Sequence, residues 1–307
     1  MRLALALFSC LLLVLPATAQ QTADSGFDLS VARPAWPAGE GPRLVIDAGH
    51  GNFHTAEGRF APFAGLLRND GFVVEGRDGP ITASSLEGVD ILVIANPLHP
   101  GNVGGANWRL PNPSAFTSEE IAVLKAWVSG GGSLLLIADH MPFAGAAQDL
   151  AGAFGFSFSN GFVMREAGQG PDIFARMDGG LRADVVTDGR STEERIGRLR
   201  TFTGSAFTAP AGARPLIVLP KGYVSKEPRV AWQFDTDSRT LPAAGMLQGA
   251  VMVYGQGRLA VFGEAAMFTA QLAGEDRRPI GFNAPSAPDN RQMVLNVARW
   301  LGGLLPA

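Results

Sequence analysis

The sequence repeats one pattern three times: a short apolar run that leads directly into a polar turn with a histidine. The runs cover residues 43–47, 91–95 and 133–138, and stretches with helical spacing of apolar residues separate them. Short apolar runs that alternate with helices are typical of buried parallel strands joined by right-handed crossovers. Ligands bind such sheets beyond the carboxyl ends of the strands. The pattern therefore predicts an α/β fold and the edge of the sheet at which a site lies.

Helix and turn signals place the remaining elements. Apolar residues at helical spacing in 60–67, followed by Gly71, predict the first helix. The sequence Thr117-x-x-Glu120 is a capping box that opens another helix. The second half of the chain is richer in turns. There, residues 248–254 and 258–262 flank Gly-Gln-Gly and predict an antiparallel hairpin. A final helix is expected from about Asp289.

The N-terminus predicts an exported protein. Residues 1–19 resemble a secretory signal peptide, with Arg2, an apolar run and the small residues Ala17 and Ala19 before the cleavage point. We expect residues 20–42 to be a flexible N-terminal segment and residues 43–307 to form a single domain. Export makes a periplasmic or secreted location the prediction.

Composition excludes several classes of function. Cys10 is the only cysteine in the 307 residues, and cleavage would remove it. The mature chain would then have no thiol nucleophile, thiolate ligand or disulfide. The formal net charge of −3 gives no reason to expect a nucleic-acid partner. No stretch after the signal segment is long and apolar enough for a membrane span.

Several motifs together resemble one family. They are DAGHGNFH at 47–54, ADH at 138–140, VTDGR at 186–190, GRLAVFGEAAMF at 257–268 and DN at 289–290. They resemble the DUF4350 family, which lies near the class I glutamine amidotransferase-like fold. That superfold includes ThuA-like proteins and ciliary and gliding-protein domains proposed to bind sugars. The resemblance covers most of residues 43–304. It implies a three-layer α/β sandwich with a mostly parallel, flavodoxin-like sheet and a late antiparallel hairpin.

One departure from the superfold bears on chemistry. True amidotransferases place a cysteine nucleophile on a sharp turn between a strand and a helix. The corresponding turn here, residues 138–143, offers Asp139 and His140 instead. Cysteine-dependent glutamine hydrolysis is therefore excluded. No serine lies in a G-x-S-x-G elbow, so a serine hydrolase is not expected either.

Two kinds of catalytic site fit the histidines and carboxylates at the predicted edge. A metal-free site would use His50 or His140 as general base, Asp139 or Asp47 to orient it, and Glu264 as acid or base. The alternative role of Glu264 is to cap a helix that begins at Ala265. A metal site would use His50, His54, His99 and His140 around a divalent ion such as zinc, although no standard zinc spacing is present.

The same edge also carries candidate ligand-binding residues. These are Asp47, Asn52, Asn96, His99 and Trp108, of which Trp108 could stack on a sugar ring or simply anchor its loop. Two functions stay open: a hydrolase acting on a carbohydrate-derived or cell-envelope substrate, and a non-catalytic module that binds such a ligand in the same pocket. A small molecule or carbohydrate is the expected partner in both.

Overall fold

The fold is built on one nine-stranded mixed sheet. The computed structural model describes residues 21–167 and 171–307. The strand order is β3-β2-β4-β5-β15-β14-β10-β6, and β11 also pairs with β14. The strands are β2 (Arg43–Asp47), β3 (Val73–Arg77), β4 (Ile91–Ala95), β5 (Ser133–Ile137), β6 (Ser157–Phe158), β10 (Phe207–Thr208), β11 (Arg214–Val218), β14 (Leu247–Tyr254) and β15 (Gly257–Phe262). Neighbours from β3 to β15 pair in parallel, and β14 pairs antiparallel with β15.

Two hydrophobic clusters lie against this sheet. Successive residues of β2 alternate between them, with Leu44 and Ile46 in one and Val45 in the other. Helices α1 (Ala61–Asn69) and α5 (Asn290–Leu301) contribute to the first cluster, whereas α2 (Ser118–Ser129) and α3 (Phe143–Ala153) contribute to the second. The alternation follows from the two-residue repeat of a strand, which points neighbouring side chains to opposite faces.

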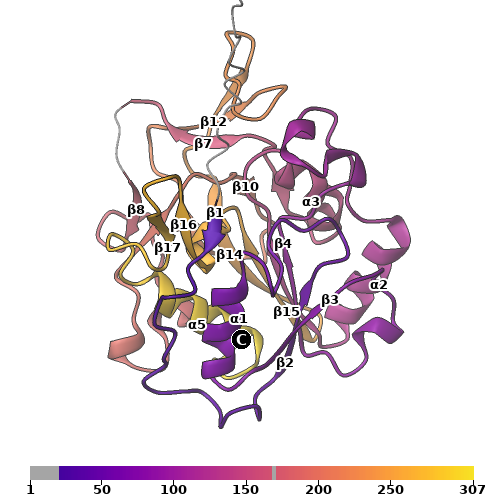
Figure 1. Cartoon of the computed structure of the whole chain (residues 1–307), viewed down its shortest axis with the longest axis vertical. Coiled ribbons are helices and arrows are strands. Elements are labelled where there is room, and N and C mark those ends of the chain that lie inside the picture. The colour runs from indigo at the N-terminus through magenta and orange to yellow at the C-terminus, as the bar shows by residue number, and fades with distance from the viewer. Residues whose placement is uncertain (1–20, 168–170) are drawn as a thin grey trace, which may run out of the picture.

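Smaller elements surround the main sheet (Figure 1). Three further sheets are formed by β1 (Gln21–Ala23), β16 (Ala270–Ala273) and β17 (Arg278–Gly281); by β13 (Arg239–Pro242), β12 (Tyr223–Glu227) and β7 (Phe162–Arg165); and by β8 (Asp172–Ala175) with β9 (Arg198–Thr201). The short helices are α4 (Val185–Asp188), η1 (Ser84–Leu86), η2 (Pro100–Asn102), η3 (Gly105–Asn107), η4 (Thr192–Glu194) and η5 (Ala266–Phe268). No helix in the described part of the chain is long and apolar enough to span a membrane.

The structure confirms the α/β organisation expected from the sequence. The three apolar runs are β2, β4 and β5, and the late hairpin is β14 with β15. The capping box of α2 is present, with both the Thr117 and the Glu120 side chains bonded to the opposite backbone N–H. These elements formed as predicted because local spacing and tertiary packing favour the same conformation.

The N-terminal segment differs from the expected flexible lead-in. Residues 21–23 form β1, which pairs with β16, and Trp36 packs edge-on against Phe72 with ring centroids 4.7 Å apart. Phe27, Leu29 and Val31 also pack against the first cluster, because these side chains gain by leaving water. The signal-peptide prediction, residues 1–19, lies outside the described residues.

Candidate functional site

Three polar residues follow neighbouring parallel strands at the same edge of the sheet. Asp47 is the last residue of β2, Asn96 follows β4, and Asp139 comes two residues after β5. The registers Ile46↔Val93 and Ala95↔Ile137 bring these three strand ends together. The predicted edge is therefore confirmed, and rigid elements position its side chains.

A cavity of about 920 Å³ opens at this edge. Its polar lining includes His54, Asn96, Asp139, His140 and Glu264, all of them named as site candidates from the sequence. Its aromatic lining consists of Phe53, Trp108, Phe143, Phe202 and Trp232. Apolar walls with a few convergent polar groups are typical of a small-molecule site.

Asn96 organises the polar floor of the cavity. Its backbone is in the left-handed region, with φ of +52°. Its Oδ1 accepts a hydrogen bond from the backbone N–H of Asp139 at 2.9 Å, and its Nδ2 donates to Nδ1 of His54 at 3.2 Å. Its carbonyl oxygen accepts from the backbone N–H of Phe53 at 2.9 Å. One buried side chain thus ties the loops after β2 and β5 to the end of β4.

Asp139 and Glu264 form a pair of carboxyl groups around one backbone turn. Asp139 Oδ2 lies 3.4 Å from the N–H of Ala265, while Glu264 accepts from the N–H of Ala266 at 2.9 Å and of Met267 at 2.8 Å. Glu264 is only 1% exposed. Its burial, and next the charge of Asp139, raise the pKa of Glu264 well above its usual range. Glu264 therefore caps η5, which is the alternative role predicted for it, and is also a carboxyl group that holds its proton.

His140 is fixed in one tautomer by its own turn. Its Nδ1 lies 2.7 Å from the carbonyl oxygen of Met141, so Nδ1 carries the proton and donates it. Nε2 has no hydrogen-bond partner among the described residues and can accept a proton. The ring stacks on Phe162 at 4.4 Å between centroids, and Trp232 meets it edge-on at 4.8 Å. His140 has the geometry of a positioned general base.

His54 is a neutral member of the same site. It is 3% exposed, and burial, helped by the charge of Arg59, lowers the pKa of His54 to about 3. Its Nδ1 accepts from Asn96, so the proton is on Nε2, which has no partner among the described residues. The sequence named His54 only as a metal ligand; the structure makes it a hydrogen-bond donor that lines the cavity.

His50 does not line the cavity, which corrects its predicted catalytic role. Its Nδ1 lies 2.9 Å from Asp47 Oδ2, and its Nε2 lies 3.1 Å from Glu120 Oε1. Burial acts to lower the pKa of His50, but the hydrogen bonds and charges of Asp47 and Glu120 outweigh it and raise the pKa. Both ring nitrogens are occupied, because the turn after β2 folds back onto α2. Asp47 is likewise engaged with His50 and is no ligand-binding residue of the cavity.

Two other predicted residues also lie elsewhere. His99 is the N-cap of η2, where its Nδ1 accepts from the N–H of Gly101 at 3.0 Å. Asn52 Oδ1 accepts from the backbone N–H of His50 at 3.0 Å. Both side chains satisfy local backbone groups, as short polar residues in turns commonly do. Over residues 21–167 and 171–307 no three His, Cys, Asp or Glu side chains form a group that could hold a metal, so the predicted four-histidine centre is not formed.

Several residues that line the cavity could not be predicted from the sequence. Phe202, Thr203 and Trp232 come from loops of the irregular second half, and Arg59 follows the DAGHGNFH motif. Thr203 and Trp232 have positive φ angles of 146° and 67°. Of these residues, only Arg59 could have been found from the sequence, because it lies between the motif and the first helix. The positions of the other three depend on how distant loops pack together.

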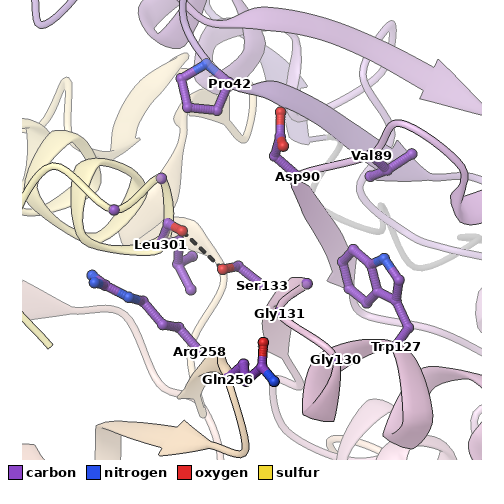
Figure 2. A pocket seen from close by; sticks show the side chains of 13 residues that line it. Pro42, Val89, Asp90, Trp127, Gly130, Gly131, Ser133, Gln256, Arg258 and Leu301 are labelled. Carbon is purple, nitrogen blue, oxygen red and sulfur yellow. Dashed lines mark hydrogen bonds between the residues drawn. The ribbon is translucent and has the colours of Figure 1, made fainter.

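A second cavity, of about 530 Å³, lies at the opposite edge of the sheet (Figure 2). Pro42, Asp90 and Ser133 line it at the amino ends of β2, β4 and β5. Its polar groups satisfy the protein itself: Ser133 Oγ donates to the carbonyl oxygen of Leu301 at 2.8 Å, and Arg258 donates to those of Trp300 and Leu305. The candidate site is therefore the cavity at the carboxyl edge.

Comparison with known proteins reveals similarity of fold. No family model matches the sequence, and no curated protein matches it. The mmIFT52 N-terminal domain superposes with a TM-score of 0.60 at 16% identity, over 84% of this chain and 97% of that one. At this identity the similarity concerns the fold alone.

Two further solved structures match this chain with lower scores. A ThuA-like protein from Bacteroides uniformis gives a TM-score of 0.44 at 11% identity, over 88% of this chain and 93% of that one. A GMP synthase component from Thermoplasma acidophilum gives 0.43 at 10% identity, over 86% of this chain and 96% of that one. The DUF4350 resemblance stays a prediction.

Proposed function

We propose that the protein is a hydrolase that acts on a carbohydrate-derived or cell-envelope substrate in the cavity at the carboxyl edge. The observation that carries this proposal is the pairing of Glu264, buried and with a raised pKa, with Asp139 and His140 in one cavity. Strongly perturbed carboxyl groups in a cleft are a feature of active sites, because acid–base catalysis needs groups whose proton affinities differ.

Each of the three groups has its own role: Glu264 is the acid, His140 is the base, and Asp139 supplies a stabilising charge. Glu264 holds its proton and can donate it to the oxygen of the leaving group. His140, whose Nε2 is free to accept, takes a proton from the attacking water, and Asp139 stabilises positive charge that develops between them. The proposal uses neither His50, whose two ring nitrogens bind carboxylates, nor His99, which caps η2 and does not line the cavity.

A second candidate function is a binding module with the same cavity. The aromatic lining favours it, because rings such as Trp108 and Trp232 offer flat faces to a sugar whether or not a bond is broken. Catalysis and binding differ in what Glu264 contributes: a proton in the first case, and only the cap of η5 in the second.

The test is hydrolysis of a panel of 4-nitrophenyl glycosides, acetylated sugars and cell-envelope glycans by the wild-type protein and by Glu264→Gln. We expect Glu264→Gln to lower kcat about 100-fold or more, because glutamine cannot donate a proton to a leaving group. Glu119→Gln, at an exposed position on α2, is the matched control and should keep full activity.

The outcomes separate the two candidates. Turnover that Glu264→Gln leaves intact would overturn the acid–base assignment. Binding of a glycan without turnover by the wild-type protein would favour the binding module instead.

We also propose export after cleavage at Ala19, membership of the DUF4350 family and the three-layer form of the amidotransferase-like fold. The motifs and the N-terminal pattern support these proposals. N-terminal sequencing of secreted protein should read Gln20-Gln21-Thr22, and a retained Met1 would refute the cleavage.

A further inference from the structure

Arg59 brings an uncompensated cation to the wall of the cavity. Its guanidinium lies over the ring of Phe53, with Cζ 3.8 Å from the centroid, and its Nη1 donates to the carbonyl oxygen of Phe53 at 3.4 Å. It forms no ion pair with any described carboxylate, although other half-buried arginines, such as Arg190 and Arg214, do. A cation that is partly removed from water and unpaired favours an anion as its partner.

The bonding of Arg59 leaves one edge of its guanidinium without a partner. Nε is covered by protein and finds no acceptor among the described residues. Nε and the second terminal nitrogen form the edge at which arginine binds a carboxylate or phosphate through two parallel hydrogen bonds. Of these two nitrogens, Nη2 makes no hydrogen bond within the described residues and is not covered, so it is the one that an anion in the cavity can reach.

Two further N–H groups of the cavity lining also have no hydrogen-bond acceptor among the described residues. His54 Nε2 carries the proton, because Nδ1 accepts from Asn96, and it has no acceptor in the described residues. Trp108 Nε1, which only donates, also lacks one. Gln271 adds a single acceptor, Oε1, in the same state. The unpartnered groups of this lining are thus mainly donors, which suits a ligand rich in acceptor oxygens.

The three donors surround one ring. The centroid of Phe53 lies 5.5 Å from that of His54 and 5.3 Å from that of Trp108, and Arg59 covers its face. The donors therefore belong to one part of the cavity wall. The carboxyl groups of Asp139 and Glu264 both accept backbone N–H groups of the turn that leads into η5. An anionic ligand group would therefore be attracted to Arg59 and repelled by the charge of Asp139.

We propose that the cavity selects an acidic carbohydrate, whose carboxylate, sulfate or phosphate group binds Arg59 and accepts hydrogen bonds from His54 and Trp108. An acidic carbohydrate would be the substrate class of the proposed hydrolase, and only its location in this cavity rests on the proposed function. The aromatic faces hold the sugar rings, and the anion fixes which end of the ligand approaches Asp139 and His140.

The experiment compares one ligand with and without its charge. Isothermal titration with trigalacturonate and with its trimethyl ester changes the anionic groups and keeps the sugar backbone. Galactose 6-sulfate and galactose 6-phosphate, each against galactose, identify the anion when it is not a carboxylate. We expect the wild-type protein to bind at least one anionic probe about 10-fold more tightly than its neutral counterpart, with affinity that falls as salt is raised.

Variants assign the preference to Arg59. Arg59→Gln should remove the preference for the charged probe over its neutral counterpart, whereas Arg59→Lys should keep part of it through charge alone. Arg195→Gln, at an exposed arginine whose nearest carboxylate oxygen is 3.5 Å away, is the matched control and should behave as the wild type. Melting temperatures of all variants establish that each is folded.

Three results would overturn the inference. They are equal affinity of the wild-type protein for charged and neutral probes, an unchanged preference in folded Arg59→Gln, and no binding of any probe. Failure of the hydrolase proposal looks different: anionic probes bind through Arg59 but are never cleaved. Turnover of neutral glycosides with no charge preference would instead retain the hydrolase and refute the acidic substrate.

Discussion

Asn96 holds His54 in a single neutral tautomer. The Oδ1 atom of Asn96 accepts the backbone N–H of Asp139, which turns its Nδ2 toward Nδ1 of His54 at 3.2 Å. Because Nδ1 must then accept, the proton of the neutral imidazole is on Nε2. The end of β4 thus sets the chemical form of a residue in the loop after β2.

The first prediction concerns the protonation of His54. Its pKa of about 3 in the folded protein, below the ordinary 6.5, means that only the unfolded chain takes up this proton between those values. The contribution of His54 to stability is therefore complete above pH 6.5 and is lost as pH falls toward 3. Nitrogen NMR should show an Nε2-protonated ring throughout pH 5–8. A His54 signal that titrates near 6.5 would contradict the prediction.

The second prediction concerns His50, whose pKa is shifted in the opposite direction to that of His54. The pKa of His50 is raised in the folded protein by Asp47 and Glu120 against the effect of burial, so its ion-pair contribution is complete below 6.5 and is lost as pH rises through the raised value. His50→Gln should destabilise the protein by about 3 kcal/mol at pH 6, because it leaves two buried carboxylates without their shared cation.

Denaturant unfolding of the wild type and of His50→Gln between pH 6 and 9 measures this effect. The difference in free energy of unfolding should shrink as pH rises. A difference that stays constant over this range would mean that hydrogen bonding, and not the charge of His50, holds the turn to α2.

The third prediction concerns the stability linked to Glu264. Burial and the neighbouring Asp139 raise its pKa, so the folded state keeps a proton that the unfolded chain releases above about 4.5. The stability of the wild type should consequently fall as pH rises above that value. Glu264→Gln, which has no proton to lose, should gain stability relative to the wild type between pH 5 and 8. Equal pH dependence of the two proteins, measured by thermal unfolding, would refute the raised pKa.

The sequence was sufficient to predict which edge of the sheet carries the site, but not what each histidine binds there. Asp47, Asn96 and Asp139 were placed correctly because strand ends follow from apolar runs, and parallel strands share an edge. His50 and His54 lie four residues apart in one motif, yet only His54 lines the cavity. The direction of each ring depends on partners distant in sequence, Glu120 for His50 and Asn96 for His54, which local spacing does not reveal.

The aromatic wall was beyond prediction for a related reason. Trp232 and Phe202 come from loops whose paths are set by long-range pairs, such as Arg109 with Val230. Trp108 was found because it lies in a long polar loop directly after β4. Elements with a regular period could be predicted, whereas loops that close over a site follow tertiary contacts.

The fourth prediction concerns a buried ion cluster far from the cavity. Arg299 and Asp70 are both fully buried, with Arg299 Nη2 2.6 Å from Asp70 Oδ1, and Nη1 of Arg299 lies 3.1 Å from Glu194 Oε1. Arg299→Met should destabilise the protein by about 3–5 kcal/mol, because it leaves buried carboxylates unpaired. Arg195→Met, at an exposed arginine, is the control and should cost less than about 1 kcal/mol. Comparable losses for both in urea unfolding would contradict the buried role.

The last prediction concerns Trp232, which covers His140. Its ring meets His140 at 4.8 Å and Phe162 at 4.6 Å, but it is 52% exposed and its φ of +67° is unfavourable for a side chain of this size. Trp232→Gly should therefore leave the melting temperature unchanged or raise it, since glycine adopts this backbone conformation without strain.

The same variant should weaken binding of a glycan ligand about 10-fold by removing an aromatic face from the cavity. Phe234→Ala, in the same loop and also in contact with Phe162 but outside the cavity lining, is the control for loop disturbance and should bind as the wild type. A strained backbone beside a cavity is expected where the side chain contacts a ligand. A Trp232→Gly protein that lost stability and kept full affinity would show that the ring of Trp232 only packs against its neighbours.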